Sequence, residues 1–78
     1  MNNAQARSAT AQLATARYLL AQFIAQLDEY DNLNREGRRT PRGRDLTARL
    51  PGLRQGRATW TERVAYLEPL AAAEAATT

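Results

Sequence analysis

The stretch that decides the fold is LATARYLLAQFIAQLDEY, residues 13–30. Leucines recur in it every seven residues, and each is followed three positions later by an alanine or an aromatic residue: Leu13, Leu20 and Leu27, then Ala16, Phe23 and Tyr30. This a/d heptad pattern places all these side chains on one stripe of a helix. Working outward, we predict one long helix over residues 4–36, with Asn2 or Asn3 as its N-cap and a left-handed Gly37 after its end.

The opposite face of this predicted helix is also apolar. Small residues and one tyrosine recur there at three- and four-residue spacing: Ala11, Ala14, Tyr18, Ala21 and Ala25. Arg17 is the only charged residue between Ser8 and Leu27. A helix that is solvated on one side usually carries a polar face about as wide as its apolar face. We therefore expect a second protein surface to cover this face as well.

Basic residues gather in the middle of the chain. Residues 35–57 hold eight arginines and two acidic residues, whereas the rest of the chain holds three arginines and six acidic residues. Four of the eight arginines fall within seven positions: Arg38, Arg39, Arg42 and Arg44. Such a run can neutralise several phosphates. It can equally be a solvated connector that pairs with the acidic residues at 28–31 or with acidic residues of a neighbouring subunit.

Residues 37–52 are the predicted connector. Thr40-Pro41 can begin a short helix over residues 41–50, because proline is favoured at the first helical position. Its two leucines, four residues apart, would face inward. The Pro-Gly pair that follows is expected to stop this helix.

A second helix is predicted over residues 53–76. Thr59 and Glu62 form a capping box, which favours a helix from about residue 60, although the stripe also allows a start at 53. Pro69 removes a backbone donor, so the helix either kinks there or divides into two. The apolar stripe of this helix consists of Trp60, Val64 and Leu67.

These elements predict one all-α domain, a helical hairpin whose long first helix returns through an arginine-rich connector to a shorter second helix broken near Pro69. We expect the second helix to pack on residues 20–30, which leaves residues 4–17 without a partner in the chain. Seventy-eight residues build only a small core, and such domains often add disulfides, metal or oligomerisation. Since Cys and His are both absent, self-association or docking on a larger assembly remains. The predicted protein interface comprises Leu13, Tyr18, Leu20, Phe23, Leu27, Tyr30, Trp60, Val64 and Leu67.

The chain shows no pattern typical of an enzyme. There is no His or Cys, Ser8 is the only serine, and no glycine-rich phosphate loop follows a strand. The acidic run at 28–31 could hold a divalent cation, but such a run is far more often a solvated face. We expect no catalysis, no cofactor, no metal and no small-molecule substrate.

We also recognise no targeting signal in the sequence. Residues 18–27 resemble the apolar part of a signal peptide, but no small-x-small cleavage site follows. Residues 9–27 have about the length of a membrane span, yet Arg17 lies near the centre. We expect a cytoplasmic or virion location and no membrane binding.

Two functional hypotheses follow. The first is a small interaction or structural protein that associates through its apolar helix faces, for instance a phage virion or assembly component, or a phage-encoded inhibitor of a host protein. The second is an arginine-rich nucleic-acid-binding accessory protein that uses residues 35–57, with Trp60 or Tyr66 stacking on a base. The aromatic residues do not interleave with the arginine run, and this weakens the second hypothesis.

Overall fold

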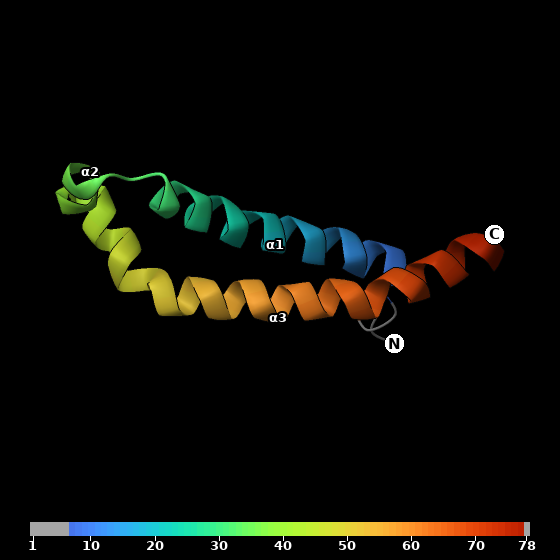
Figure 1. Cartoon of the computed structure of the whole chain (residues 1–78). Coiled ribbons are helices and arrows are strands. Elements are labelled where there is room, and N and C mark those ends of the chain that lie inside the picture. Colours follow the sequence, from blue (N-terminus) through green and yellow to red (C-terminus); the bar gives the residue numbers. More distant parts are fainter. Residues whose placement is uncertain (1–6, 78) are drawn as a thin grey trace.

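The computed structural model describes residues 7–77 and contains three helices, α1 (Ala9–Asp31), α2 (Arg35–Arg39) and α3 (Pro41–Thr77). α1 and α3 lie side by side and antiparallel, and α2 forms the end at which the chain turns back (Figure 1). The predicted all-α helical hairpin is therefore confirmed. The molecule is long and thin, with extents of 53 × 26 × 15 Å.

The relative lengths of the two long helices differ from the prediction. α1 has 23 residues and α3 has 37, so the second helix is the longer one. α3 begins at Pro41 as predicted, and the hydroxyl of Thr40 accepts a hydrogen bond of 3.0 Å from the amide of Gly43. It then continues through the connector, so the predicted stop after residue 50 and the predicted second start at 53 or 60 are wrong.

Pro51 and Pro69 lie inside α3, and the chain stays helical through both. Figure 1 shows that α3 changes direction in its yellow part and again in its red part. A proline inside a helix removes one backbone hydrogen bond, and its ring clashes with the preceding turn. Where packing holds the helix both before and after the proline, the helix bends there. The prolines therefore break the straight course of α3 without ending it, and the Thr59–Glu62 pair lies mid-helix instead of at a start.

α1 is shorter than predicted at both ends. It begins after Ser8, whose hydroxyl accepts a hydrogen bond of 3.0 Å from the amide of Ala11. The predicted Asn2 or Asn3 cap lies outside the described residues. The helix ends at Asp31, because Asn34 caps α2 instead and accepts a hydrogen bond of 2.8 Å from the amide of Gly37. Gly37 thus lies inside α2, and no glycine within residues 7–77 has a positive φ.

Two apolar clusters join α1 to α3. The first lies toward the open end of the hairpin and consists of Ala9, Leu13, Ala16, Leu67 and Ala71, with Trp60 and Val64 packed against it. The second lies toward the turn and consists of Leu27, Leu46 and Leu53, with Phe23, Tyr30, Leu33 and Leu50 packed against it. The expectation that the Trp60 stripe packs on residues 20–30 is therefore wrong, because the longer α3 shifts the pairing by several turns.

This pairing also supplies a partner for the N-terminal half of α1. Leu13 and Ala16 are buried against Leu67 and Ala71, so the described part of the half that was predicted to lack an intrachain partner is covered. Leu46 is fully buried at 0% exposure and Leu50 is half-buried, as the sequence predicts for the start of α3. The heptad stripe therefore stabilises the hairpin itself.

Candidate functional site

Most residues predicted as a protein interface lie inside the hairpin. Three of the nine are buried: Leu13, Leu27 and Leu67. Five more are half-buried: Leu20, Phe23, Tyr30, Trp60 and Val64. Tyr18 is different, since 64% of it is exposed. The structure therefore separates Tyr18 from the other eight and places it on the far side of α1 from α3.

The outer face of α1, which we define as Ala14, Tyr18, Ala21 and Ala25, is exposed along its whole length. No charged residue belongs to this face. Ile24, at 40% exposure, borders it on one edge together with Arg17, which pairs with Glu68 of α3 at 3.1 Å. Of the second apolar stripe seen in the sequence, α3 leaves these four residues exposed, whereas Ala11 is half-buried.

The basic cluster, Arg38, Arg39, Arg42 and Arg44, lies on α2 and the first turn of α3. Arg42 donates two hydrogen bonds to Glu29, of 2.8 and 2.7 Å, and this contact lowers the pKa of the Glu29 carboxyl. The Arg38 guanidinium lies 4.4 Å from the centroid of the Tyr30 ring. Arg39 and Arg44 have no ion pair within residues 7–77. Two of the four guanidiniums are therefore engaged by the fold and two are free.

Acidic residues surround the basic cluster. Residues 28–45 contain five arginines and five acidic residues, so the turn of the hairpin is close to neutral as a whole. Asp28 and Asp31 form no ion pair in the described part of the chain. The pairing of these arginines with residues 28–31 that was considered from the sequence occurs only at Glu29.

A shallow groove runs along one edge of the hairpin, over the middle of α3 and, at one end, between α3 and the start of α1. Its larger hollow measures about 320 Å³ and is lined by Thr59, Trp60, Glu62, Arg63 and Tyr66. A smaller hollow of about 150 Å³ is lined by Arg7, Gln12, Thr15, Trp60 and Arg63. Because Trp60 and Arg63 line both hollows, we treat them as one feature, the edge groove.

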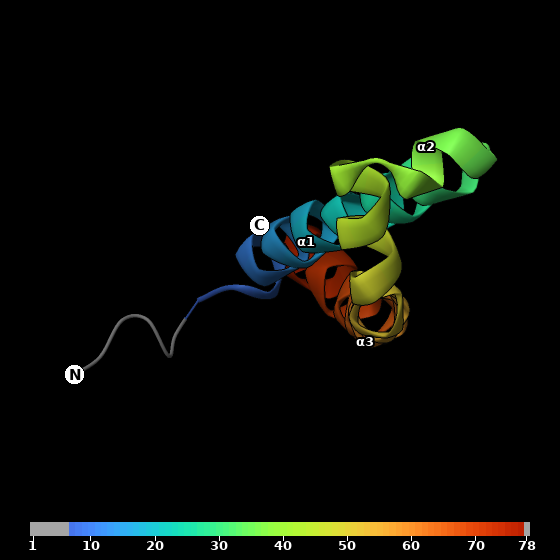
Figure 2. The same cartoon turned by 90° about the vertical axis from the view of Figure 1, so that its left-hand side faces the viewer.

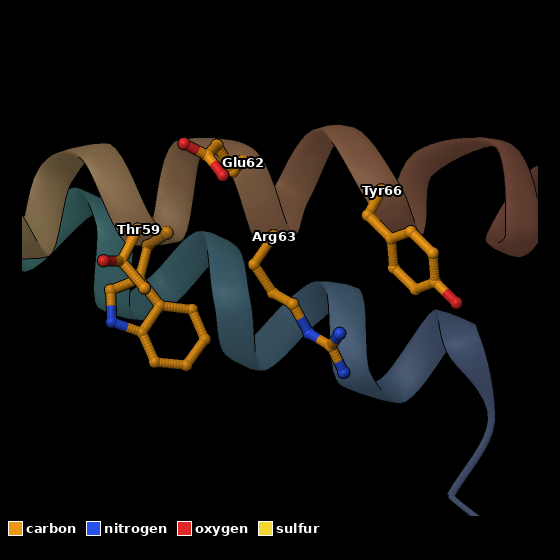
Figure 3. A pocket seen from close by; sticks show the side chains of 5 residues that line it. Thr59, Glu62, Arg63 and Tyr66 are labelled. Carbon is orange, nitrogen blue, oxygen red and sulfur yellow. The ribbon is translucent and has the colours of Figure 1, made fainter.

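The side chains of the edge groove are held in place by neutral partners. Arg63 donates a hydrogen bond of 3.1 Å to the side-chain oxygen of Gln12, and its guanidinium lies 5.4 Å from the centroid of the Tyr66 ring. Figure 3 shows Arg63 and Tyr66 reaching from α3 toward α1, while Glu62, which lines the same hollow, is directed away from α1. Arg7 donates a hydrogen bond of 2.9 Å to the hydroxyl of Thr15.

Glu74 performs a role that sequence reasoning missed. Its carboxylate accepts hydrogen bonds from the amides of Ala9, at 2.7 Å, and Thr10, at 3.0 Å, and from the Thr10 hydroxyl at 2.9 Å. These bonds lower the pKa of Glu74. A carboxylate at a helix N-terminus is favoured by the free amides and by the helix dipole. Glu74 therefore ties the last turns of α3 to the first turn of α1.

The edge groove was also missed, although its signal is visible in the sequence. Trp60, Arg63 and Tyr66 recur at three-residue spacing, which brings an aromatic ring, a guanidinium and a second ring to neighbouring positions on one side of a helix. The arginine run at 38–44 contains no aromatic residue, so this interleaved pattern lies outside it. The contact with Gln12 depends on the helix pairing and has no local signal.

Residues 7–77 bring together no group of three or more candidate metal ligands. Nor is any helix there both long enough and apolar enough to cross a membrane. No protein-family model, no curated protein and no solved structure matches the chain.

Proposed function

We propose that this chain is a non-enzymatic helical interaction protein and that the outer face of α1 is its protein-binding surface. The observation that carries the proposal is the exposure of Tyr18, 64%, in the middle of an uncharged stripe of alanines. Large aromatic side chains commonly anchor protein interfaces, and small neighbours let a second backbone approach closely. A phage virion or assembly component remains the setting we propose, on the grounds of size and composition alone.

The occupant we propose for this face is a second copy of the chain. An antiparallel pair of α1 helices centred between Ala21 and Gln22 would set Tyr18 of each copy against Ala25 of the other. The same register brings Arg17 of one copy within about one turn of Asp28 of the other. The face is thus complementary to itself in shape and, at its border, in charge, as a two-fold interface requires.

Absolute mass from light scattering over a range of concentrations tests this proposal. We expect twice the mass of one chain, with little dependence on salt because the interface is apolar. Ala21→Glu places a charge at the centre of the face and should return the mass to that of a monomer. Ala58→Glu introduces the same change at an exposed alanine of α3 and should leave the mass unchanged.

Two results would contradict the proposal. A parent protein that remains monomeric at every concentration is one of them. Equal effects of Ala21→Glu and Ala58→Glu on the mass are the other, because the association would then not involve the outer face of α1. Circular dichroism of both variants establishes that the hairpin itself persists, which we expect because both alanines are exposed in a single chain.

Nucleic-acid binding through the basic cluster is the second candidate function. Its support is the pair Arg39 and Arg44, which are exposed and form no ion pair within residues 7–77. The five acidic residues between 28 and 45 weaken it, because they cancel the field that would attract a polyanion. Changing Arg39 and Arg44 to Gln should abolish salt-sensitive binding of nucleic acid if this candidate is right, and no change in binding would remove it.

A further inference from the structure

The edge groove combines two aromatic rings with two cations that the fold leaves uncompensated. Arg7 and Arg63 form no ion pair in the described residues, and they line the same 150 Å³ hollow. Every other side chain that lines that hollow is uncharged. An anion that enters it therefore meets two guanidiniums and no carboxylate.

Both guanidiniums keep donors free for such an anion. The hydrogen bonds of Arg63 to Gln12 and of Arg7 to Ala11 and Thr15 all use the Nη2 atom. The Nε and Nη1 groups have no hydrogen-bond partner within residues 7–77. A guanidinium presents a planar fork of donors that matches the oxygen atoms of a phosphate. Gln12 and Thr15 thus hold the two arginines in position while leaving this capacity unused.

The rings beside these cations are placed for stacking. Tyr66 is 60% exposed, and Trp60 is half-buried, with part of its indole against the first apolar cluster and part lining both hollows. Burying large apolar rings would lower the free energy of the hairpin, so their exposure at a groove indicates a surface that a flat ligand can cover. Nucleobases stack on such rings irrespective of base identity.

We propose that the edge groove binds a nucleotide unit, with its base against Trp60 and Tyr66 and its phosphate on Arg7 and Arg63. The unit can belong to a single-stranded nucleic acid or be a free nucleotide, since both present the same base and phosphate. Glu62 lines the larger hollow beside the proposed base, whereas the smaller hollow, in which we place the phosphate, is lined by no carboxylate. This inference goes beyond the protein-binding function and uses a different surface.

Trp60 provides the measurement, because it is the only tryptophan in the chain. The full-length protein is titrated with a 12-nucleotide oligothymidylate, with thymidine monophosphate and with inorganic polyphosphate, and tryptophan fluorescence is followed. We expect saturable quenching by the oligonucleotide and none by polyphosphate. If thymidine monophosphate binds as tightly as the oligonucleotide, the ligand is a free nucleotide. If the monophosphate binds much more weakly, the ligand is a single-stranded nucleic acid.

Matched variants locate the site. Tyr66→Ala should weaken binding about fivefold or more, while Tyr18→Ala, which removes an equally exposed ring from the outer face of α1, should not change it. Arg63→Gln should weaken binding and reduce the salt dependence by about 0.7 in log–log slope. Arg54→Gln removes the same charge from an exposed position outside the groove and serves as its control.

Three outcomes would overturn the inference. Absence of quenching by both thymidylate ligands is the first, and equal quenching by polyphosphate, which would mean attraction by charge alone, is the second. The third is loss of binding on changing Arg39 and Arg44 to Gln while Arg63→Gln binds normally, because the site would then be the basic cluster. None of these outcomes affects the mass measurement on Ala21→Glu, so the two proposals fail independently.

Discussion

Two glycines inside α3 have opposite surroundings. A Cβ added at Gly56 would lie less than 3.0 Å from three ring atoms of Phe23, whereas a Cβ added at Gly52 would meet nothing within 4 Å. The absence of a side chain at Gly56 therefore lets the Phe23 ring of α1 lie directly on the α3 backbone. Gly52, with no such neighbour, only lowers the helix propensity of α3.

Alanine at these two positions should change stability in opposite directions. Gly52→Ala should raise the free energy of unfolding by about 0.5–1 kcal/mol, because alanine loses less conformational entropy in a helix. Gly56→Ala gains the same helix propensity but forces Phe23 to move, at a cost of about 1–3 kcal/mol, so it should lower the free energy of unfolding. Urea denaturation followed by circular dichroism measures both. An increase in stability for Gly56→Ala would show that Phe23 moves aside freely.

At the scale of elements, the N-terminus of α1 is stabilised in part by a residue of α3. The amides of Ala9 and Thr10 bind Glu74 of α3, and the next amide, that of Ala11, binds Ser8. The first turn of a helix leaves its amides without partners inside the helix, so these contacts satisfy three of them. The position at which α1 begins therefore depends on α3 as well as on its own sequence.

Protonation of Glu74 should destabilise the hairpin. Its pKa in the folded state lies below the ordinary value of 4.5, so the folded state favours the carboxylate. The stabilisation is present in full above pH 4.5 and is lost as the pH falls through the folded-state pKa. We expect the difference in melting temperature between the parent and Glu74→Gln to be constant from neutral pH to about pH 5 and to shrink in more acidic solution.

Glu62→Gln is the control for this experiment, because Glu62 accepts no hydrogen bond from a helix N-terminus and forms no ion pair within residues 7–77. It should change the melting temperature less than Glu74→Gln does at neutral pH. A difference between the parent and Glu74→Gln that stays the same from neutral to strongly acidic solution would contradict the capping role.

The helical spacing of apolar residues predicted which side chains lie inside the hairpin, but it did not predict their partners. Leu27, Leu46 and Leu67 were expected to face the inside of the hairpin and are buried there, whereas Leu13 was expected to meet another protein and is instead buried against α3. The register failed because Pro51-Gly52 is a local stop signal that packing on α1 overrides. Because α3 continues without a break from Pro41, its apolar stripe lies further along α1 than predicted and covers the N-terminal half of α1.

The candidate binding surfaces could likewise be predicted only where their sequence pattern is local. The outer face of α1 was visible in the sequence, because a second stripe on one helix is a local pattern. Glu74 and the Arg63–Gln12 contact were not, since each joins residues more than fifty positions apart. The basic cluster was visible as composition, but the structure alone shows that Glu29 and Tyr30 engage two of its four guanidiniums.

At the scale of the whole molecule, the hairpin is far from spherical. Its radius of gyration, 16.7 Å, exceeds the value of about 12 Å expected for a compact domain of this length and is well below the value of about 27 Å expected for an unfolded chain. Figure 2 shows α1 and α3 close to end-on, with α2 at one side. A two-helix layer of this kind leaves the far side of each helix exposed, so a large share of its apolar surface is available for association.

This shape makes small-angle X-ray scattering a test of how the copies associate. Packing through the outer faces of α1, with the helices antiparallel, would double the mass and keep the longest dimension close to the 53 Å of one chain. Association through the turns of two hairpins would also double the mass but would extend the longest dimension toward twice that length. We expect the first result for the parent and a radius of gyration near 17 Å for monomeric Ala21→Glu. An elongated dimer would contradict the assignment of the interface to the outer face of α1, even though the mass measurement alone would have supported it.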